Sequence, residues 1–383
     1  MYRWLIFLWA LFLLLPMAAL ATHDVYLDVP LYCQETNNWC GAASAQMTHD
    51  GYPTPPGPKY FSQTSLWNCI QAHKDDPSVN WATDPDGLKY CMNDMGHPPS
   101  GVWVVEAKSS YLSEMYAVLY WMTVQRYPTP VLVWHQQHWV VITGFTTDVD
   151  PTTHSTVSLQ FIEFNNPWPP CSGGSGGTYH YVTGASWQVS YFCGPVNISS
   201  SKWYGKYIAV LEPPKKSGSV RTVEMVERGQ PIPPEKAVKL ALDWIKRYKL
   251  YKHGPLSVLT RTKPFEPLLV NKERKGYYIV PFGYSEKRIV AGIILNAYTG
   301  EFEDAGAFRK PIRYLTAKEA MEIVAKYTGL RRVPEPELIF TPCQQTEDYF
   351  WPLWKFVIKG EMTLYVDQNG KVYKRLVIPP PGD

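Results

Sequence analysis

The stretch from Gln34 to Met47 constrains the fold most, because its composition changes abruptly at Cys40. Polar and turn-favouring residues precede the cysteine, and small residues follow it from Gly41 to Ala45. This change predicts a helix that carries Cys40 in its first turn. The partial positive charge and the unpaired N–H groups of a helix N-terminus lower the pKa of a thiol placed there. We therefore expect Cys40 to be a reactive thiolate.

Gln34 lies in the loop that leads into this helix. Its amide N–H groups and the backbone N–H of Cys40 can together form an oxyanion hole. The alternatives are a disulfide role for Cys40 and an ordinary loop amide for Gln34. Cys33 is the rival thiol, but no helix of small residues follows it. We therefore prefer Cys40 as the nucleophile.

A candidate base lies where a short polar tip separates two apolar, strand-like runs. His138 begins the second run, so a strand should hold its ring beside the mouth of a hairpin. A structural histidine in the core is the common alternative. His135 competes for the role, and a His-x-x-His pair can bind a metal, but no third ligand stands out. We expect His138 to be the acid–base partner, and no metal.

A third polar residue lies where the next strand-like run ends, in Asn165-Asn166-Pro167-Trp168. An asparagine there can accept a hydrogen bond from an imidazole and fix its orientation. Asn-Pro is also an ordinary turn signal. We prefer Asn166 to Asn165 because it directly precedes the proline.

Four motifs occur in the chain order of papain-like cysteine peptidases: Gln34, Asn38–Ser44, His138–Gly144 and Asn166–Trp168. They resemble most closely the compact branch that includes the bacteriocin leader-processing peptidases and the staphopains. The resemblance covers roughly residues 25–211 and implies an α+β fold, in which the cysteine helix packs on an antiparallel sheet. Leader-processing enzymes usually carry Asp where Asn166 stands, so this position is closer to the papain and staphopain pattern. The segment 51–99 has no clear counterpart, which leaves the shape of the cleft open.

The resemblance implies hydrolysis of peptide bonds in a protein or peptide substrate through a thioester acyl-enzyme, without a cofactor. Cys40, His138, Asn166 and Gln34 would be the nucleophile, the acid–base, the orienting residue and the oxyanion donor. Two alternatives stay open. The same residues serve acyl transferases and cell-wall amidases, and an inert peptidase scaffold could act as a binding or inhibitory protein.

The N-terminal residues 1–21 have the pattern of a secretory signal peptide. Arg3 is followed by an apolar run from Trp4 to Leu15 and by the small-x-small sequence Ala19-Leu20-Ala21. The alternative is an uncleaved membrane anchor. We expect a secreted or extracytoplasmic protein that has no membrane contact after cleavage. The formal net charge of +3 is too small to argue for nucleic acid as a partner. The oligomeric state stays open.

An exported chain with seven cysteines can form three disulfides and keep one thiol. Sequence alone does not decide the pairing. Short separation in sequence favours the pairs Cys69–Cys91 and Cys171–Cys193. Cys33 is then left to pair with Cys343.

The composition changes after residue 212, where a Pro- and Lys-rich stretch predicts a linker. Helical and strand-like patterns then follow twice. The expected division is a peptidase domain at 22–212, a linker at 213–219, and two small α+β units at 220–312 and 313–383. Strand–turn–strand phrases at Ile294–Glu301 and Tyr365–Val372 resemble those of PepSY-type domains. That resemblance implies an inhibitory or chaperone role, and a spacer or surface-binding role is the alternative.

Overall fold

The computed structural model describes residues 22–51, 61–96, 103–171, 176–211, 219–221, 230–272, 275–358, 362–380 and 382. The expected signal peptide and residues 213–218 of the expected linker lie outside these ranges. Among the helices of the described ranges, none has the length and apolar character needed to cross a membrane.

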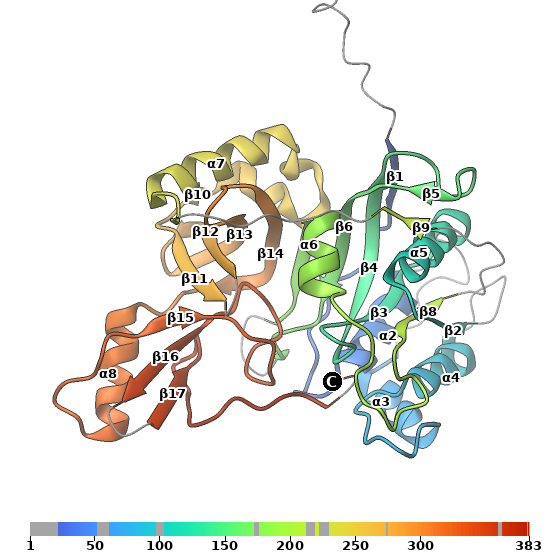
Figure 1. The fold of residues 1–383 in the computed structure, drawn as a ribbon, viewed down its shortest axis with the longest axis horizontal. Helices are drawn as coiled ribbons and strands as arrows, with labels where there is room; N and C mark the ends of the chain where they lie inside the picture. Colours follow the sequence, from blue (N-terminus) through green and yellow to red (C-terminus); the bar gives the residue numbers. More distant parts are fainter. Residues whose placement is uncertain are drawn as a thin grey trace, which may run out of the picture.

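The first half of the chain packs helices against an antiparallel sheet, which confirms the expected α+β class (Figure 1). Its helices are α2 (Cys40–Asp50), α3 (Gln63–Ala72), α4 (Pro85–Gly96), α5 (Tyr111–Gln125), α6 (Gly184–Ser186) and η2 (Trp187–Tyr191). Its strands are β1 (His23–Tyr26), β2 (Val104–Lys108), β3 (Thr129–Val133), β4 (His138–Thr147), β5 (Thr156–Val157), β6 (Leu159–Asn166), β7 (Thr178–Thr183) and β8 (Tyr207–Leu211). Helix α2 packs on β3 and β4 in the middle of this half.

The second half repeats a helix followed by antiparallel strands, as the sequence predicts. The first set is α7 (Pro234–Arg247), η3 (Leu250–Lys252), η4 (Gly254–Arg261), β10 (Lys263–Pro264), β11 (Leu268–Lys272), β12 (Lys275–Ser285), β13 (Arg288–Asn296) and β14 (Phe302–Ile312). The second set is α8 (Ala317–Thr328), β15 (Glu337–Ile339), β16 (Leu353–Ile358), β17 (Met362–Val366) and β18 (Val372–Tyr373). A capping box begins α8: the Thr316 side chain accepts from the backbone N–H of Glu319, and the Glu319 side chain accepts from the backbone N–H of Thr316.

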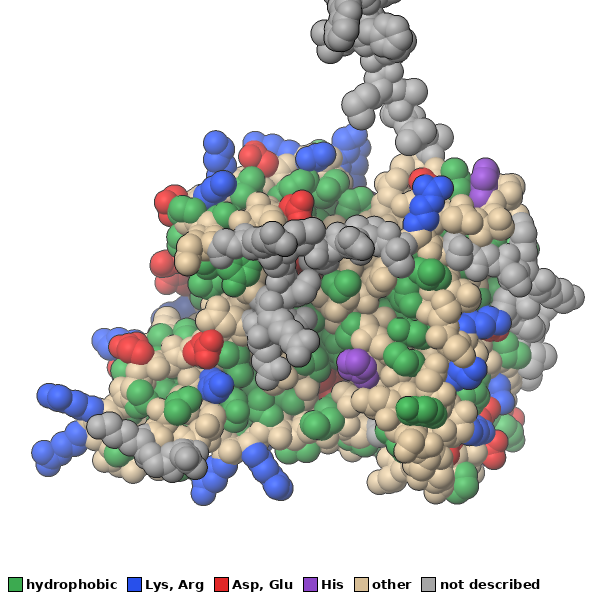
Figure 2. Space-filling view, viewed as in Figure 1, with side chains coloured by type: hydrophobic (Ala, Val, Ile, Leu, Met, Phe, Trp, Pro, Cys, Tyr) green, Lys and Arg blue, Asp and Glu red, His purple; other side chains and the backbone are tan. Residues whose placement is uncertain are grey.

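One continuous sheet joins the two halves, in the order β18-β17-β16-β15-β11-β12-β13-β14-β7-β6-β4-β3-β8-β2. The junction is the antiparallel pair β14–β7, in which Asp304 lies opposite Val182 and Phe308 opposite Thr178. A short strand, β9 (Ser219–Val220), pairs separately with β5. Because β7 also pairs with β6, a single strand separates the second half from the strand that ends at Asn166. Figure 2 shows Lys and Arg side chains along the outer edge of the second half, away from this junction.

The segment between β15 and β16 is anchored to the sheet by Phe350. Its ring is fully buried over Gly292 and Gly306, which lie opposite each other on β13 and β14. A Cβ added at Gly306 would lie 2.4 Å from the ring, so the two glycines form a slot that the ring fills. The segment that carries Glu347 and Asp348 is thereby fixed beside β14.

We expect Phe350→Ala to lower the free energy of unfolding by about 3–5 kcal/mol, because it leaves a cavity in the slot. Denaturant unfolding of the full chain measures the loss. The control is Val357→Ala on β16, whose side chain is 62% exposed; its effect should stay within about 0.5 kcal/mol. Equal effects of the two substitutions would contradict the anchoring role.

Candidate active site

Cys40 is the first residue of α2, as the sequence predicts. Its side chain is fully buried, and the backbone N–H of Trp139 donates to its sulfur at 3.4 Å. A backbone donor and a helix N-terminus both favour the thiolate over the thiol. The sulfur therefore lies in surroundings that suit a nucleophile.

His138 is the first residue of β4, again as predicted. Its ring lies against that of Trp134, with the centroids 5.4 Å apart. Nε2 lies 2.9 Å from Oδ1 of Asn166, and the ring also shares a side-chain hydrogen bond with Cys40. The structure thus brings together the three residues that the sequence analysis selected.

The amide of Asn166 is oriented by partners on both sides. Its Oδ1 accepts the backbone N–H of Trp168 at 2.9 Å as well as the His138 contact. Its Nδ2 donates to the backbone carbonyl of Glu347 at 2.9 Å. The oxygen therefore faces the imidazole, and the imidazole donates through Nε2. Asn165 instead donates to the carbonyls of Val29 and Pro30, away from His138.

Gln34 is fully buried, and its loop is bonded to the residue that follows Asn166. Its backbone N–H donates to the carbonyl of Pro167 at 3.0 Å, and its own carbonyl accepts from Cys171 at 2.7 Å. Its side-chain Nε2 donates to the carbonyl of Asn37 at 2.9 Å. An amide nitrogen carries two N–H donors, so one hydrogen remains for an oxyanion.

Two disulfides are present, and one of them differs from the expectation. Cys69–Cys91 is confirmed. The expected pairs Cys171–Cys193 and Cys33–Cys343 are wrong, because Cys33 bonds Cys171 across 138 residues of sequence. Backbone hydrogen bonds from Gln34 to Pro167 and from Cys171 to Gln34 bring the two cysteines together. The disulfide thereby fixes the loop of Gln34, and Cys40, Cys193 and Cys343 stay outside disulfides.

His135 is exposed at the tip between β3 and β4, while His138 is fully buried. Within the described ranges, one group of residue types that bind metals has its atoms close enough to share an ion: Cys69, His73 and Cys91. The disulfide between the two cysteines occupies their sulfurs, so this group does not fit a metal ion.

Two acidic residues that the sequence analysis did not select also reach the site. Oε2 of Glu347 lies 2.7 Å from Nδ1 of His138, and both side chains are buried. Burial alone lowers the pKa of His138, but the carboxylate of Glu347 and the sulfur of Cys40 more than reverse this effect and raise the pKa well above its usual value. Asp348 accepts from the Nδ2 of Asn166 at 3.4 Å.

Asp348 also belongs to a buried ionic cluster at the junction of the two halves. Nδ1 of His180, on β7, lies 2.8 Å from Asp304 on β14, and Nε2 lies 3.2 Å from Asp348. Burial lowers the pKa of His180, but the two carboxylates raise it to about 9. Tyr191 donates a further hydrogen bond to Asp304. A protonated His180 therefore links the two halves close to Asn166.

This cluster predicts a pH dependence of stability. A raised pKa contributes stability that is fully present below the unfolded-state pKa of roughly 6.5 and lost as the pH rises through about 9. We expect the difference in unfolding free energy between wild type and His180→Gln to shrink by about 3 kcal/mol over this range. Unfolding curves at several pH values measure it, with the exposed His154→Gln as control. A difference that does not change with pH would contradict the cluster.

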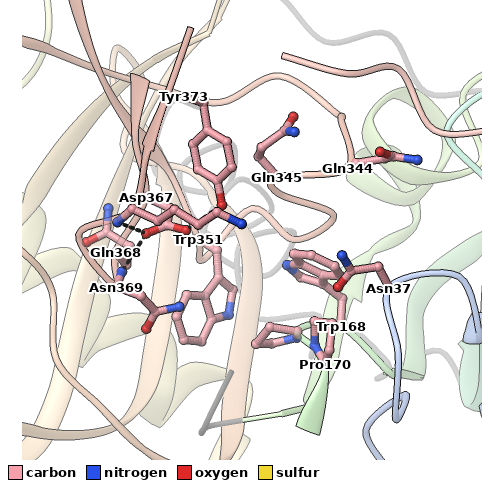
Figure 3. A pocket seen from close by; sticks show the side chains of 12 residues that line it. Asn37, Trp168, Pro170, Gln344, Gln345, Trp351, Asp367, Gln368, Asn369 and Tyr373 are labelled. Carbon is pink, nitrogen blue, oxygen red and sulfur yellow. Dashed lines mark hydrogen bonds between the residues drawn. The ribbon is translucent and has the colours of Figure 1, made fainter. Parts of the chain in front are cut away.

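A pocket of about 230 Å³ lies between the two halves beside the site. The indole rings of Trp168, next to Asn166, and of Trp351 from the second half lie opposite each other across it (Figure 3). Asn37, the hydrogen-bond acceptor of Gln34, also lines it. The second half therefore forms one wall of the space next to the candidate catalytic residues.

Residues 26–188 match the Peptidase_C39 like family. This match supports a papain-like cysteine peptidase in the half of the chain that carries the site. One solved structure, the Bacillus megaterium YpeB C-terminal domain, is 12% identical over 58% of this chain and 85% of its own length, with a TM-score of 0.17. No curated protein matches the chain.

Proposed function

We propose that this protein is an exported cysteine peptidase that hydrolyses peptide bonds through a thioester acyl-enzyme. The observation that carries the proposal is the contact of His138 with both Cys40 and Asn166. A helix N-terminus, a strand start and a strand end supply the three residues. The two disulfides are compatible with an oxidising compartment.

The chemistry follows from these positions. The Cys40 thiolate attacks the carbonyl carbon of the substrate and forms a C–S bond. The N–H groups of Gln34 and Cys40 stabilise the oxyanion. His138 donates the proton on Nδ1 to the leaving amine as the C–N bond breaks. It then takes a proton from the attacking water, and the C–S bond breaks to release the acid and restore the thiolate. Asn166 holds the Nε2–H throughout, so that Nδ1 faces the sulfur.

The test is cleavage of a mixed peptide library, analysed by mass spectrometry. Because Glu347 lies against His138, both the full chain and its Glu347→Gln variant are assayed. Each is paired with a Cys40→Ala version as control. We expect cleavage that disappears with Cys40. If neither protein cleaves any peptide in a Cys40-dependent way, the proposed function is wrong.

A further inference from the structure

The candidate catalytic residues are closed off in this structure. Cys40, His138, Asn166 and Gln34 are each 0% exposed. A peptidase must admit an extended chain that places a carbonyl carbon against the sulfur and an amide nitrogen beside the imidazole. Such a chain has no access here. Two segments of the second half place atoms directly against the imidazole of His138 and the sulfur of Cys40.

The first of these is the segment between β15 and β16, which places Glu347 against His138. Its Oε2 is 2.7 Å from Nδ1, the nitrogen that must deliver a proton to the leaving amine. The contact is an ion pair held by the packing of the segment. It occupies the position that the leaving group needs.

The second is the stretch that follows β18 and includes Val377 and Gly382. The carbonyl of Gly382 lies 3.4 Å from the sulfur of Cys40 and accepts the backbone N–H of Thr83 at 3.0 Å. A peptide carbonyl of this chain thus lies against the nucleophile, where a substrate must lie. Figure 1 shows the last part of the chain running from the side of β17 to the start of α2.

The fit at Gly382 depends on the absence of a side chain. Its φ is +70°, a backbone conformation that other residues rarely adopt. A Cβ there would lie 2.1 Å from the carbonyl oxygen of Thr83 and 3.1 Å from Nε1 of Trp139. Even alanine is therefore too large for the contact.

The two segments are tied to each other. The backbone N–H of Gln344 donates to the carbonyl of Val377 at 2.8 Å, and the N–H of Val377 donates to Oε1 of Gln345 at 2.9 Å. Phe350 anchors the first segment in its slot on the sheet. They therefore form one covering unit on the site.

We propose that this covering unit, through Glu347 and Gly382, holds the Cys40 site in a latent state, and that the site opens only when the unit is displaced. The proposal rests on the proposed function for its meaning in catalysis. The accessibility of the thiol can be measured without catalysis.

The experiment uses the full chain with Cys193→Ser and Cys343→Ser, so that Cys40 is the one cysteine outside the two disulfides. The test variants are Glu347→Gln, Gly382→Ala and the two combined. Glu347→Gln keeps the backbone carbonyl that accepts the hydrogen bond from Nδ2 of Asn166. The matched control for Gly382→Ala is Gly329→Ala, because Gly329 has a φ of +74° and nothing within 4 Å of a Cβ. The control for Glu347→Gln is the exposed Glu322→Gln.

The rate of Cys40 alkylation by iodoacetamide is followed by mass spectrometry, and peptide cleavage is assayed in parallel. We expect each test variant to react about tenfold faster than the parent. The Cβ of Gly382→Ala clashes with the carbonyl of Thr83, and Glu347→Gln removes the ion pair with His138. The double variant should be faster still, and both controls should match the parent. Unfolding midpoints identify any variant that reacts because it is unfolded.

An unchanged rate in the folded double variant would overturn the latent state. A slower rate in Glu347→Gln would also overturn it, because Glu347 would then support the thiolate. Faster alkylation without cleavage of any peptide would leave the latent state standing and contradict the peptidase function. If the parent chain cleaved peptides as fast as the double variant, the latent state would be contradicted and the peptidase function would stand.

Discussion

Cys40→Ala should reduce peptide cleavage by at least about 10⁴-fold in the full chain that carries Glu347→Gln. The thioester forms on the sulfur of Cys40, which both His138 and the backbone N–H of Trp139 contact. Alkylation at this position disappears with the thiol. The cleavage rates of Cys40→Ala, His138→Ala and the double variant are then compared. If the two side chains act as one unit, the double variant loses little more activity than either single variant.

The same substitution should hardly change stability. Cys40 belongs to neither disulfide, so its replacement removes one buried sulfur and costs about 1 kcal/mol. The matched control is the double replacement Cys69→Ala and Cys91→Ala, which removes a disulfide and should cost about 2–4 kcal/mol. Denaturant unfolding compares the two. If Cys40→Ala cost as much as the lost disulfide and left cleavage intact, Cys40 would be a structural residue.

Local signals in the sequence were sufficient to place the candidate residues on their elements. The change from polar to small residues marks the start of α2 at Cys40. The polar tip before an apolar run marks the start of β4 at His138, and Asn-Pro marks the end of β6 at Asn166. Each signal involves neighbours in the chain, and each element forms by local turn chemistry and strand alternation.

Contacts between distant parts of the chain could not be predicted in this way. Asn166 and Glu347 are 181 residues apart, and nothing in the acidic pair Glu347-Asp348 shows that it reaches a histidine. The sequence of β14 mixes small, charged and aromatic residues, so its local pattern predicts neither the strand nor its pairing with β7. The prediction of the disulfide pairing is wrong for the same reason. Short separation in sequence favours Cys171–Cys193, whereas folding brings Cys171 to Cys33.

Gln34→Ala should lower kcat by about 10²–10³ and leave KM nearly unchanged, because an oxyanion donor acts in the transition state and not in substrate binding. The measurement is made in the Glu347→Gln chain. Gln63→Ala is the matched control: Gln63 is also buried and holds the same loop through the carbonyl of Cys33 and the N–H of Glu35. If loop geometry alone mattered, both substitutions would lower kcat alike. A loss confined to Gln34 assigns the effect to its amide hydrogen, whereas an unchanged kcat would remove Gln34 from the oxyanion hole and leave the backbone N–H of Cys40 as the donor.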